Sequence, residues 1–260
     1  MAPDILTLTD THAHLADPAF DADRTRVLQR ARDAGVGAVV TVGETLEEAR
    51  RILDLAHSHP EIIPAAGLHP VCLDLDQAEE TAAFIDRHAD RFAAVGEVGL
   101  DYWKVQDEEG RAVQRTIFEM FIQLSRRLDL PLNVHSRSAS RRVVEILLAS
   151  GAGRVQLHAF DGRASSALPA LEAGYLFSIP PSIVRSRQKQ KLVRALPLDA
   201  LLLESDSPAL GPDPERRNEP ANILVALKAV AEIKGVNEDA VREAVIENTA
   251  KLYGIGARTS

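Results

Sequence analysis

The chain has a single cysteine and no long apolar run, and each of these absences excludes a structural feature. Cys72 is the only cysteine among 260 residues, so no disulfide can form within the chain, and a reducing compartment fits. No apolar stretch approaches the roughly 18 residues needed to cross a bilayer. The first distinctive motif lies near residue 12, which leaves no room for a secretory signal peptide before it. We therefore expect a cytoplasmic protein.

An excess of positive charge is also missing. The chain carries 30 Lys and Arg residues against 38 Asp and Glu residues, a net charge of -8. This balance argues against a protein that wraps duplex DNA with a broad basic face, but it is compatible with an enzyme that grips one strand end locally. The most basic stretch, RSRQKQKLVR at 185–194, is interpreted as a solvated helix face rather than a track for phosphates.

Segments rich in Val, Ile and Leu alternate with amphipathic stretches along the whole chain. Eight of these segments are predicted strands: 5–11, 36–42, 62–67, 93–98, 130–135, 154–159, 175–179 and 200–205. The predicted helices include 24–34, 46–58, 111–128, 221–234 and 238–252. Such repetition indicates parallel strands joined by right-handed crossovers, and eight units favour a closed (β/α)8 TIM barrel. No linker interrupts the pattern, so residues 1–260 are predicted to form a single domain.

A pair of histidines, His12 and His14, ends the first predicted strand. Side chains two residues apart on a strand point the same way, so both imidazoles can converge on one ion. Two half-buried histidines with backbone partners would give the same pattern. Nucleotide-cofactor folds are disfavoured, because no Gly-x-Gly-x-x-Gly follows this strand and no P-loop occurs in the chain.

Further residues able to bind metal ions lie where other predicted strands end, at the catalytic face of such a barrel. They are His69, Glu97, His135, His158 and Asp206. The remaining histidines fall at predicted helix ends and are expected in solvent: His57, His59 and His88. Each strand-end histidine alone could be an ordinary core residue. Five of them with two carboxylates on one rim are hard to explain by packing, whereas divalent ions bind deprotonated carboxylate and neutral imidazole.

These candidate ligands outnumber what one tetrahedral ion needs. Four imidazoles and two carboxylates suit two ions about 3.5–4 Å apart that share a carboxylate, and Glu97 is the natural bridge. Two divalent ions with Glu97, Asp206 and one hydroxide leave a formal charge of about +1, which favours a phosphodiester substrate. Arg137, two residues after His135, could bind a phosphate or form a salt bridge at the rim. The ions could be zinc, magnesium or manganese.

Taken together, the motifs resemble those of a known family. The motifs, in chain order, are HAH at 12–14, GLHP at 67–70, GEVGLD at 96–101, HSR at 135–137, HAF at 158–160, ESDSP at 204–208 and RNEP at 217–220. The chain resembles the TatD family of metal-dependent deoxyribonucleases, within the amidohydrolase superfamily. The stretch SIPPSIVRSRQKQK at 178–191 is similar to the subgroup of TatD-domain-containing protein 3.

The resemblance implies a role for each candidate residue. One ion would be held by His12, His14, Glu97 and Asp206, and a second by Glu97, His135 and His158. His69 and Arg137 would contact the substrate phosphate, and Asp206 would orient the attacking water and accept its proton. The chain departs from the family pattern at Ala13, at Ser205 and in the loop with Pro180 and Pro181. Only that loop is expected to affect which substrate enters.

We therefore expect a monomeric metal-dependent hydrolase that cleaves phosphodiester bonds at DNA ends, as a 3′–5′ exonuclease. The alternative is an amidohydrolase that acts on a small amide, ester or lactone. Many such enzymes carry a carbamylated lysine where this chain has Glu97, which favours the nuclease. A non-catalytic binding protein with a relic pocket is a third possibility, disfavoured because all six predicted metal ligands are present.

Overall fold

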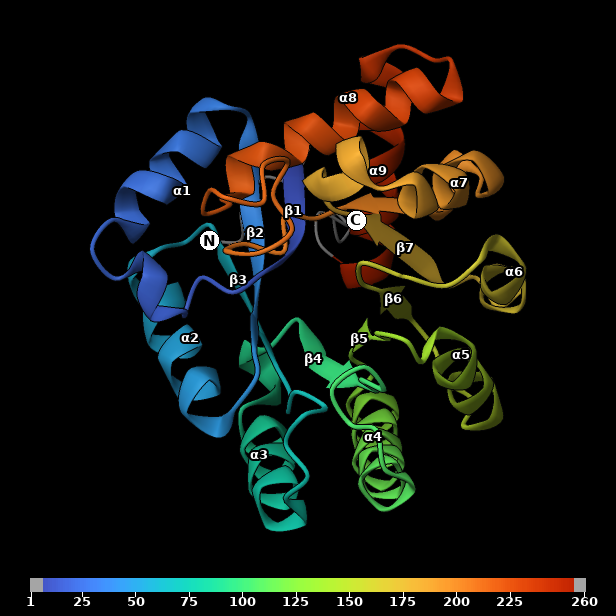
Figure 1. Ribbon diagram of the computed structural model, residues 1–260. Helices are drawn as coiled ribbons and strands as arrows, with labels where there is room; N and C mark the ends of the chain where they lie inside the picture. Colours follow the sequence, from blue (N-terminus) through green and yellow to red (C-terminus); the bar gives the residue numbers. More distant parts are fainter. Residues whose placement is uncertain (1–6, 255–260) are drawn as a thin grey trace, which may run out of the picture.

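Eight parallel strands form one sheet whose spatial order is the order of the sequence, and the sheet curls into a barrel (Figure 1). The computed structural model describes residues 7–254. The strands are β1 (Leu8–Ala13), β2 (Val36–Gly43), β3 (Ile62–Ala66), β4 (Ala94–Gly99), β5 (Leu132–His135), β6 (Val155–Leu157), β7 (Leu176–Ile179) and β8 (Leu201–Leu203). The predicted (β/α)8 TIM barrel is confirmed. The predicted start of the first strand at residue 5 lies outside the described residues.

The helices lie outside the ring of strands (Figure 1). They are α1 (Arg24–Asp33), α2 (Leu46–Ser58), α3 (Leu75–Arg87), α4 (Glu108–Leu128), α5 (Ser140–Ala149), α6 (Ala164–Glu172), α7 (Arg187–Ala195), α8 (Ile223–Lys234) and α9 (Glu238–Tyr253). The helix predicted at 111–128 begins earlier because Asp107 caps it, accepting a hydrogen bond from Gly110 N at 2.7 Å. None of these helices is long and apolar enough to cross a membrane.

The barrel closes between β1 and the segment that follows β8. His14 N donates to Ser207 O at 2.8 Å, and Asp206 N donates to His12 O at 2.8 Å. These two backbone bonds fix His12, in β1, and His14, just after it, directly beside Asp206. The first and last predicted metal ligands are therefore neighbours in space although nearly two hundred residues separate them along the chain.

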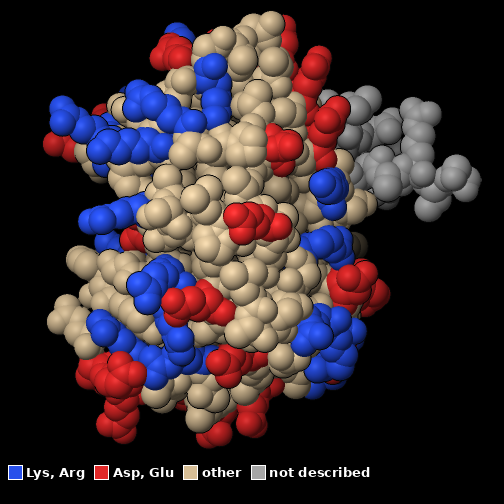
Figure 2. Space-filling view, turned by 90° about the vertical axis from the view of Figure 1, so that its right-hand side faces the viewer, with Lys and Arg blue, Asp and Glu red and all other residues tan. Residues whose placement is uncertain are grey.

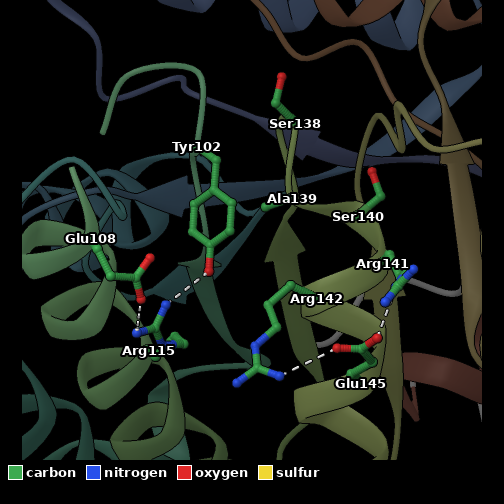
Figure 3. Close-up of a pocket in the computed structure, with 9 residues that line it drawn as sticks. All are labelled: Tyr102, Glu108, Arg115, Ser138, Ala139, Ser140, Arg141, Arg142 and Glu145. Atoms are coloured by element: carbon green, nitrogen blue, oxygen red, sulfur yellow. Dashed lines mark hydrogen bonds and ion pairs between the residues drawn. The ribbon is translucent and has the colours of Figure 1, made fainter. Parts of the chain in front are cut away.

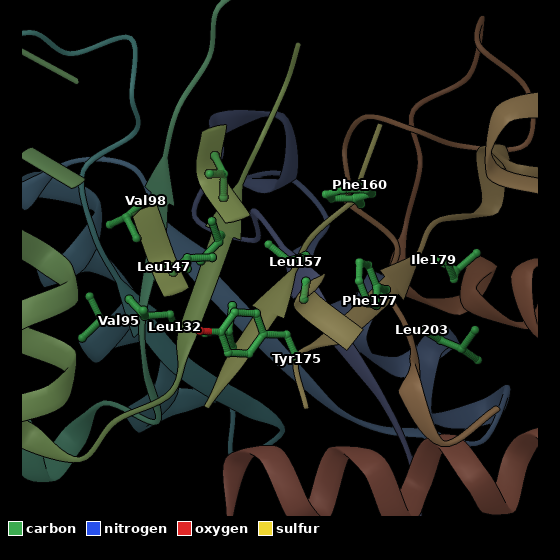
Figure 4. Close-up of a cluster of buried hydrophobic side chains, with 14 of the residues drawn as sticks. Val95, Val98, Leu132, Leu147, Leu157, Phe160, Tyr175, Phe177, Ile179 and Leu203 are labelled. Carbon is green, nitrogen blue, oxygen red and sulfur yellow. The ribbon is translucent and has the colours of Figure 1, made fainter. Parts of the chain in front are cut away.

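The apolar core surrounds the strands, while part of the barrel interior is polar. Figure 4 shows part of this core: strand residues from β4 to β8, together with Leu147 of α5. The strand residues include Val95, Val98, Leu132, Leu157, Phe177, Ile179 and Leu203. Inside the barrel, Asn133 and Gln156 are fully buried, and each donates a hydrogen bond across to the carbonyl of Thr11 on β1. This polar layer lies directly beneath the strand ends and supports the side chains there.

Candidate metal centre

The structure brings all six predicted metal ligands together at the carboxyl ends of the strands. A cavity of about 280 Å³ opens above them, and five of the six contribute to its lining: His14, Glu97, His135, His158 and Asp206. The sixth, His12, is completely buried beneath it. His57, His59 and His88 lie at helix ends outside this cluster, as predicted, and none of them is buried.

Donor atoms of His12, His14 and Glu97 come together at the centre of this cluster, with Asp206 beside the two imidazoles. His12 Nε2 and His14 Nε2 lie 3.2 Å apart, and each is 3.5 Å from Glu97 Oε2. Asp206 Oδ1 is 3.5 Å from the first nitrogen and 3.3 Å from the second. An ideal tetrahedral ion with ligand bonds of about 2.0–2.1 Å would separate its ligands by about 3.3–3.4 Å. His12, His14 and Glu97 have ligand atoms within 4.8 Å of one another, and Asp206 lies at similar distances from the two imidazoles, so this group could hold a single divalent ion.

The other carboxylate oxygen of Glu97 faces two further imidazoles. Glu97 Oε1 is 2.5 Å from His135 Nδ1 and 3.3 Å from His158 Nε2. The longer separation fits two ligands of one ion. The shorter one is a hydrogen bond, so that pair stands closer than two metal ligands would. Glu97 is 2% exposed and connects both groups of histidines through its two oxygens.

Two buried residues that sequence reasoning missed orient these histidines. His12 Nδ1 donates to Asn133 Oδ1 at 2.8 Å, which leaves the Nε2 lone pair free to bind an ion. His158 Nδ1 lies 3.3 Å from Glu204 Oε2, which directs its Nε2 to the centre in the same way. Asn133 could have been found from its spacing, because it lies two residues before His135 on the same strand face.

The two orienting residues belong to one hydrogen-bonded network inside the barrel. Asn133 Nδ2 donates to the Tyr253 hydroxyl at 3.2 Å, and that hydroxyl donates to Gln156 Oε1 at 2.5 Å. Gln156 Nε2 donates to Ser178 Oγ at 2.8 Å, which in turn donates to Glu204 Oε2 at 2.5 Å. The network links the side chain that orients His12 to the one that orients His158, so the two imidazoles are held as a unit.

The carboxylates of the centre favour their ionised forms despite burial. Burial raises the pKa of Glu97, but the imidazoles of His158 and His135 outweigh this effect and hold that pKa well below its ordinary value. Burial lowers the pKa of His14, but its hydrogen bond to Asp206 and the nearby carboxylate charges raise the pKa to about 9. Without an ion, protons on the histidines balance the carboxylates, so metal binding must release protons.

His69 lies beside the cluster and is neutral at physiological pH. Burial lowers the pKa of His69 to about 4. Its Nδ1 accepts a hydrogen bond from Val71 N at 3.3 Å, which places the ring proton on Nε2. The ring packs edge-on against His135, with centroids 4.9 Å apart, on the wall of the cavity. His69 can therefore donate a hydrogen bond to an anion in this cavity.

Arg137 at the rim contacts an aromatic ring, whereas a salt bridge was considered from the sequence. The guanidinium lies over the exposed ring of Trp103, 3.8 Å from the ring centroid, and forms no salt bridge with any residue in 7–254. The rim salt bridge considered from the sequence is therefore wrong. Arg137 also lines a second cavity of about 300 Å³, which shares His135, His158 and Asp206 with the first.

The basic stretch at 185–194 is not a purely solvated face. Arg187 and Lys191 are exposed on α7, but Lys189 is only 8% exposed, and its Nζ donates to Ala159 O at 2.9 Å. The interpretation of the whole stretch as solvated is wrong at this residue. Helical spacing explains why, because Lys189 lies three and four residues before the buried Leu192 and Val193 and so shares their inward face.

A further cavity lies outside the barrel mouth, between α4 and α5 (Figure 3). It measures about 540 Å³ and has several arginines on its wall. Arg115 pairs with Glu108 at 2.6 Å, and Arg142 with Glu145 at 3.3 Å. Because these charges are compensated by neighbouring carboxylates, this cavity has less affinity for anions than its arginines alone would indicate.

Comparisons with known proteins agree with this geometry. The sequence matches the family described as TatD related DNase over residues 9–254. A human protein named deoxyribonuclease TATDN3 is 43% identical over 258 residues, covering 95% of this chain and 94% of the human protein. An uncharacterized metal-dependent hydrolase, TatD of Mycobacterium tuberculosis, is 36% identical over 261 residues, covering 96% of this chain and 98% of its own. The crystal structure of YjjV, a TatD homologue from Escherichia coli, superposes with a TM-score of 0.88 at 28% identity, covering 95% and 98% of the two chains.

Proposed function

Because this chain belongs to the TatD-related DNase family, we propose that it hydrolyses phosphodiester bonds at DNA ends with two divalent ions at the mouth of the barrel. The expected mode is removal of nucleotides in the 3′–5′ direction. One observation carries the proposal: the ligand atoms of His12, His14 and Glu97 lie within 4.8 Å of one another, and Asp206 Oδ1 lies 3.5 and 3.3 Å from the two imidazole nitrogens.

The second ion is assigned to the other oxygen of Glu97 with His135 and His158. These donors are a carboxylate and two imidazoles, which suit zinc and manganese. Magnesium prefers oxygen ligands and fits this set less well. The shared carboxylate supports a pair of ions rather than two independent sites.

Asp206 is the residue that we assign to the proton of the attacking water. Bound divalent ions lower the pKa of water and stabilise negative charge on phosphoryl oxygens. Burial raises the pKa of Asp206, but hydrogen bonding from His14 and the charge of His158 lower it overall, so the carboxylate is ionised and can accept a proton. Neutral His69 would donate a hydrogen bond to a phosphate oxygen from the opposite wall.

The proposal is tested with the purified chain and a single-stranded oligonucleotide labelled at its 5′ end. We expect a ladder of products shortened from the 3′ end when zinc, manganese or magnesium is supplied, and no cleavage after chelation. A circular single strand, which has no end, should resist. Failure to cleave DNA with any of these ions, or hydrolysis of nitrophenyl esters and lactones instead, would favour the small-molecule alternative.

Asp206→Asn should lower the turnover number by several powers of ten, because the amide cannot accept a proton. The melting temperature should change little, since the amide has nearly the same shape. The matched control is Asp54→Asn on the exposed face of α2, which should leave turnover unchanged. Turnover of Asp206→Asn close to that of the wild type would refute the assignment.

A further inference from the structure

The second cavity adjoins the metal centre and contains a buried cation that the proposed mechanism does not use. This cavity, which we call the annex, is lined in part by Arg137, Lys189, His158 and Asp206 and measures about 300 Å³. Two of these residues, His158 and Asp206, also line the cavity over the metal centre. A molecule that fills one cavity can therefore extend into the other.

Lys189 is placed as an anion-binding group would be. Its ammonium is buried, and the only acceptor it meets among residues 7–254 is the carbonyl of Ala159, at 2.9 Å. No carboxylate in that range lies within salt-bridge distance of it, although Glu204, Asp206 and Asp161 are near enough to act on its charge. An ammonium has three donors, so further hydrogen bonds can be made to a ligand in the annex.

The backbone at Ala159 shapes this wall. Ala159 has a positive φ of 42°, which is unusual for a residue with a Cβ and is often found near functional sites. Its N–H donates to Glu204 Oε1 at 2.8 Å, and its carbonyl accepts from Lys189. The residue that follows the predicted metal ligand His158 is therefore fixed between a buried carboxylate and a buried ammonium.

Of the two carboxylates on the annex wall, Asp206 belongs to the predicted metal centre, and Asp161 forms hydrogen bonds with other residues. It accepts a hydrogen bond from Ser138 N at 2.7 Å and another from the Ser140 hydroxyl. Its charge is partly offset by these donors rather than by Lys189. The annex thus combines two carboxylates, Asp161 and the predicted metal ligand Asp206, with two cationic side chains, Lys189 and Arg137, neither of which forms an ion pair within 7–254.

We propose that the annex is a second phosphate subsite, in which Lys189 binds the phosphate next to the one that is cleaved. The inference rests on the proposed nuclease function and deepens it, because a chain of nucleotides presents a second phosphate one nucleotide away from the scissile bond. Arg137, stacked on Trp103 at the outer wall, is positioned to bind the same phosphate from the solvent side. Lys189 is thus a specificity-determining residue that favours polynucleotides over isolated phosphodiesters.

The competing explanation is that Lys189 only holds the turn at Ala159 and so positions His158. Two substrates separate these roles. Bis(p-nitrophenyl) phosphate has one phosphodiester and no neighbouring phosphate, whereas an oligonucleotide has both. Replacing a residue that positions the metal centre changes the hydrolysis of both substrates. Replacing a residue that binds the second phosphate changes only the hydrolysis of the oligonucleotide.

Lys189→Met should therefore raise KM for a single-stranded oligonucleotide by about tenfold or more, because a hydrogen bond to a charged group is lost. Its kcat/KM for bis(p-nitrophenyl) phosphate should stay within about twofold of the wild type, and Lys189→Arg should recover most of the oligonucleotide KM. The matched control is Lys191→Met, on the exposed face of the same helix, which should change neither substrate. An equal loss on both substrates, or no loss on either, would overturn the subsite.

Binding without turnover gives a second readout. The metal-loaded wild type should bind a deoxynucleoside 3′,5′-bisphosphate about tenfold more tightly than the 5′-monophosphate by calorimetry, and Lys189→Met should lose that preference. A preference that persists in Lys189→Met would contradict the subsite. A wild type that cleaves no DNA would instead contradict the proposed function, so the two failures are distinguishable.

Discussion

Glu97 is the residue on which both halves of the centre depend. Its Oε2 faces His12 and His14, whereas its Oε1 faces His135 and His158. A single side chain therefore sets the separation between the two groups of histidines. Because it is buried, its charge must be compensated by ions or by protons on the surrounding imidazoles.

The number of ions bound to Glu97 variants should show whether Glu97 is shared between two ions. Glu97→Gln removes the common charge, so we expect the purified variant to lose most of both ions from a wild-type content of about two equivalents. His135→Ala removes a ligand from one group only and should retain about one equivalent. Elemental analysis after dialysis measures both. One equivalent in the wild type, or equal losses in the two variants, would be inconsistent with a bridged pair.

Asp10 is a second buried carboxyl, and its titration should be visible in stability. Its Oδ1 accepts from Ser205 N at 2.7 Å, and its Oδ2 has no hydrogen-bond partner among residues 7–254. Burial raises the pKa of Asp10 from 3.8 to about 8. The folded chain therefore keeps a proton on this carboxyl that the unfolded chain releases above its own lower pKa.

The direction in which Asp10 changes the free energy of unfolding with pH follows from proton linkage. Between the unfolded value of 3.8 and the folded value of about 8, unfolding releases a proton from Asp10, so this residue's contribution to stability falls as pH rises. Relative to Asp10→Asn, the wild-type free energy of unfolding should fall by up to about 1.4 kcal/mol per pH unit in that window. Urea unfolding with chelator present, at pH values from 5 to 8, measures the difference, and a constant difference would contradict the assignment.

At the scale of elements, the backbone geometry at the end of β4 requires a glycine at position 99. Its φ is 145°, and a Cβ built there would lie 2.0 Å from His135 O on the neighbouring strand. A side chain at this position would push β4 and β5 apart at the point where Glu97 meets His135. The glycine in the GEVGLD motif therefore permits the close approach of two strands that carry predicted ligands.

Gly99→Ala should consequently be destabilised by about 1–3 kcal/mol from backbone strain alone, with further loss from the clash. Nuclease activity should fall with it, because His135 moves relative to Glu97. Gly153→Ala is the matched control, since a Cβ there meets nothing within 4 Å. Chemical unfolding and turnover measure both variants, and equal behaviour of the two would show that the strands can separate without cost.

The order of elements was predictable from the sequence, but some site residues were not. Strands rich in Val, Ile and Leu, and helices with capping residues such as Thr45 and Asp107, are fixed by local chemistry, so their predicted bounds differ little from the observed ones. Lys189 and Asn133 acquire their roles only when segments far apart in the sequence meet. The prediction that Lys189 is solvated was wrong, because its position on the inward face of the helix, rather than its residue type, determines its burial.

At the scale of the whole molecule, acidic residues outnumber basic ones. On the face that Figure 2 shows, Lys and Arg side chains are interspersed with Asp and Glu side chains. This agrees with the net charge of -8. Anionic substrates must therefore be attracted locally, at the mouth of the barrel and in the annex, rather than by a field over the surface.

The salt dependence of DNA binding should accordingly be shallow. If the centre and the annex together engage two phosphates of a single strand, the logarithm of affinity should fall against the logarithm of salt concentration with a slope of about -1.4. Oligonucleotide affinity measured from 50 to 200 mM salt tests this. A slope steeper than about -4 would indicate a wider basic contact that the present geometry does not account for.

Because backbone bonds join His12 and His14 to the segment after β8, the predicted metal centre can form only after the chain has been made through β8 and Ser207. A nascent polypeptide that has reached only β7 already contains both histidines, yet it lacks Asp206 and the neighbour that holds them in register. A copy that ends before Asp206 therefore lacks a predicted ligand of the first proposed ion site. The topology thus withholds a nucleic-acid-degrading activity from partial translation products, without any separate inhibitor.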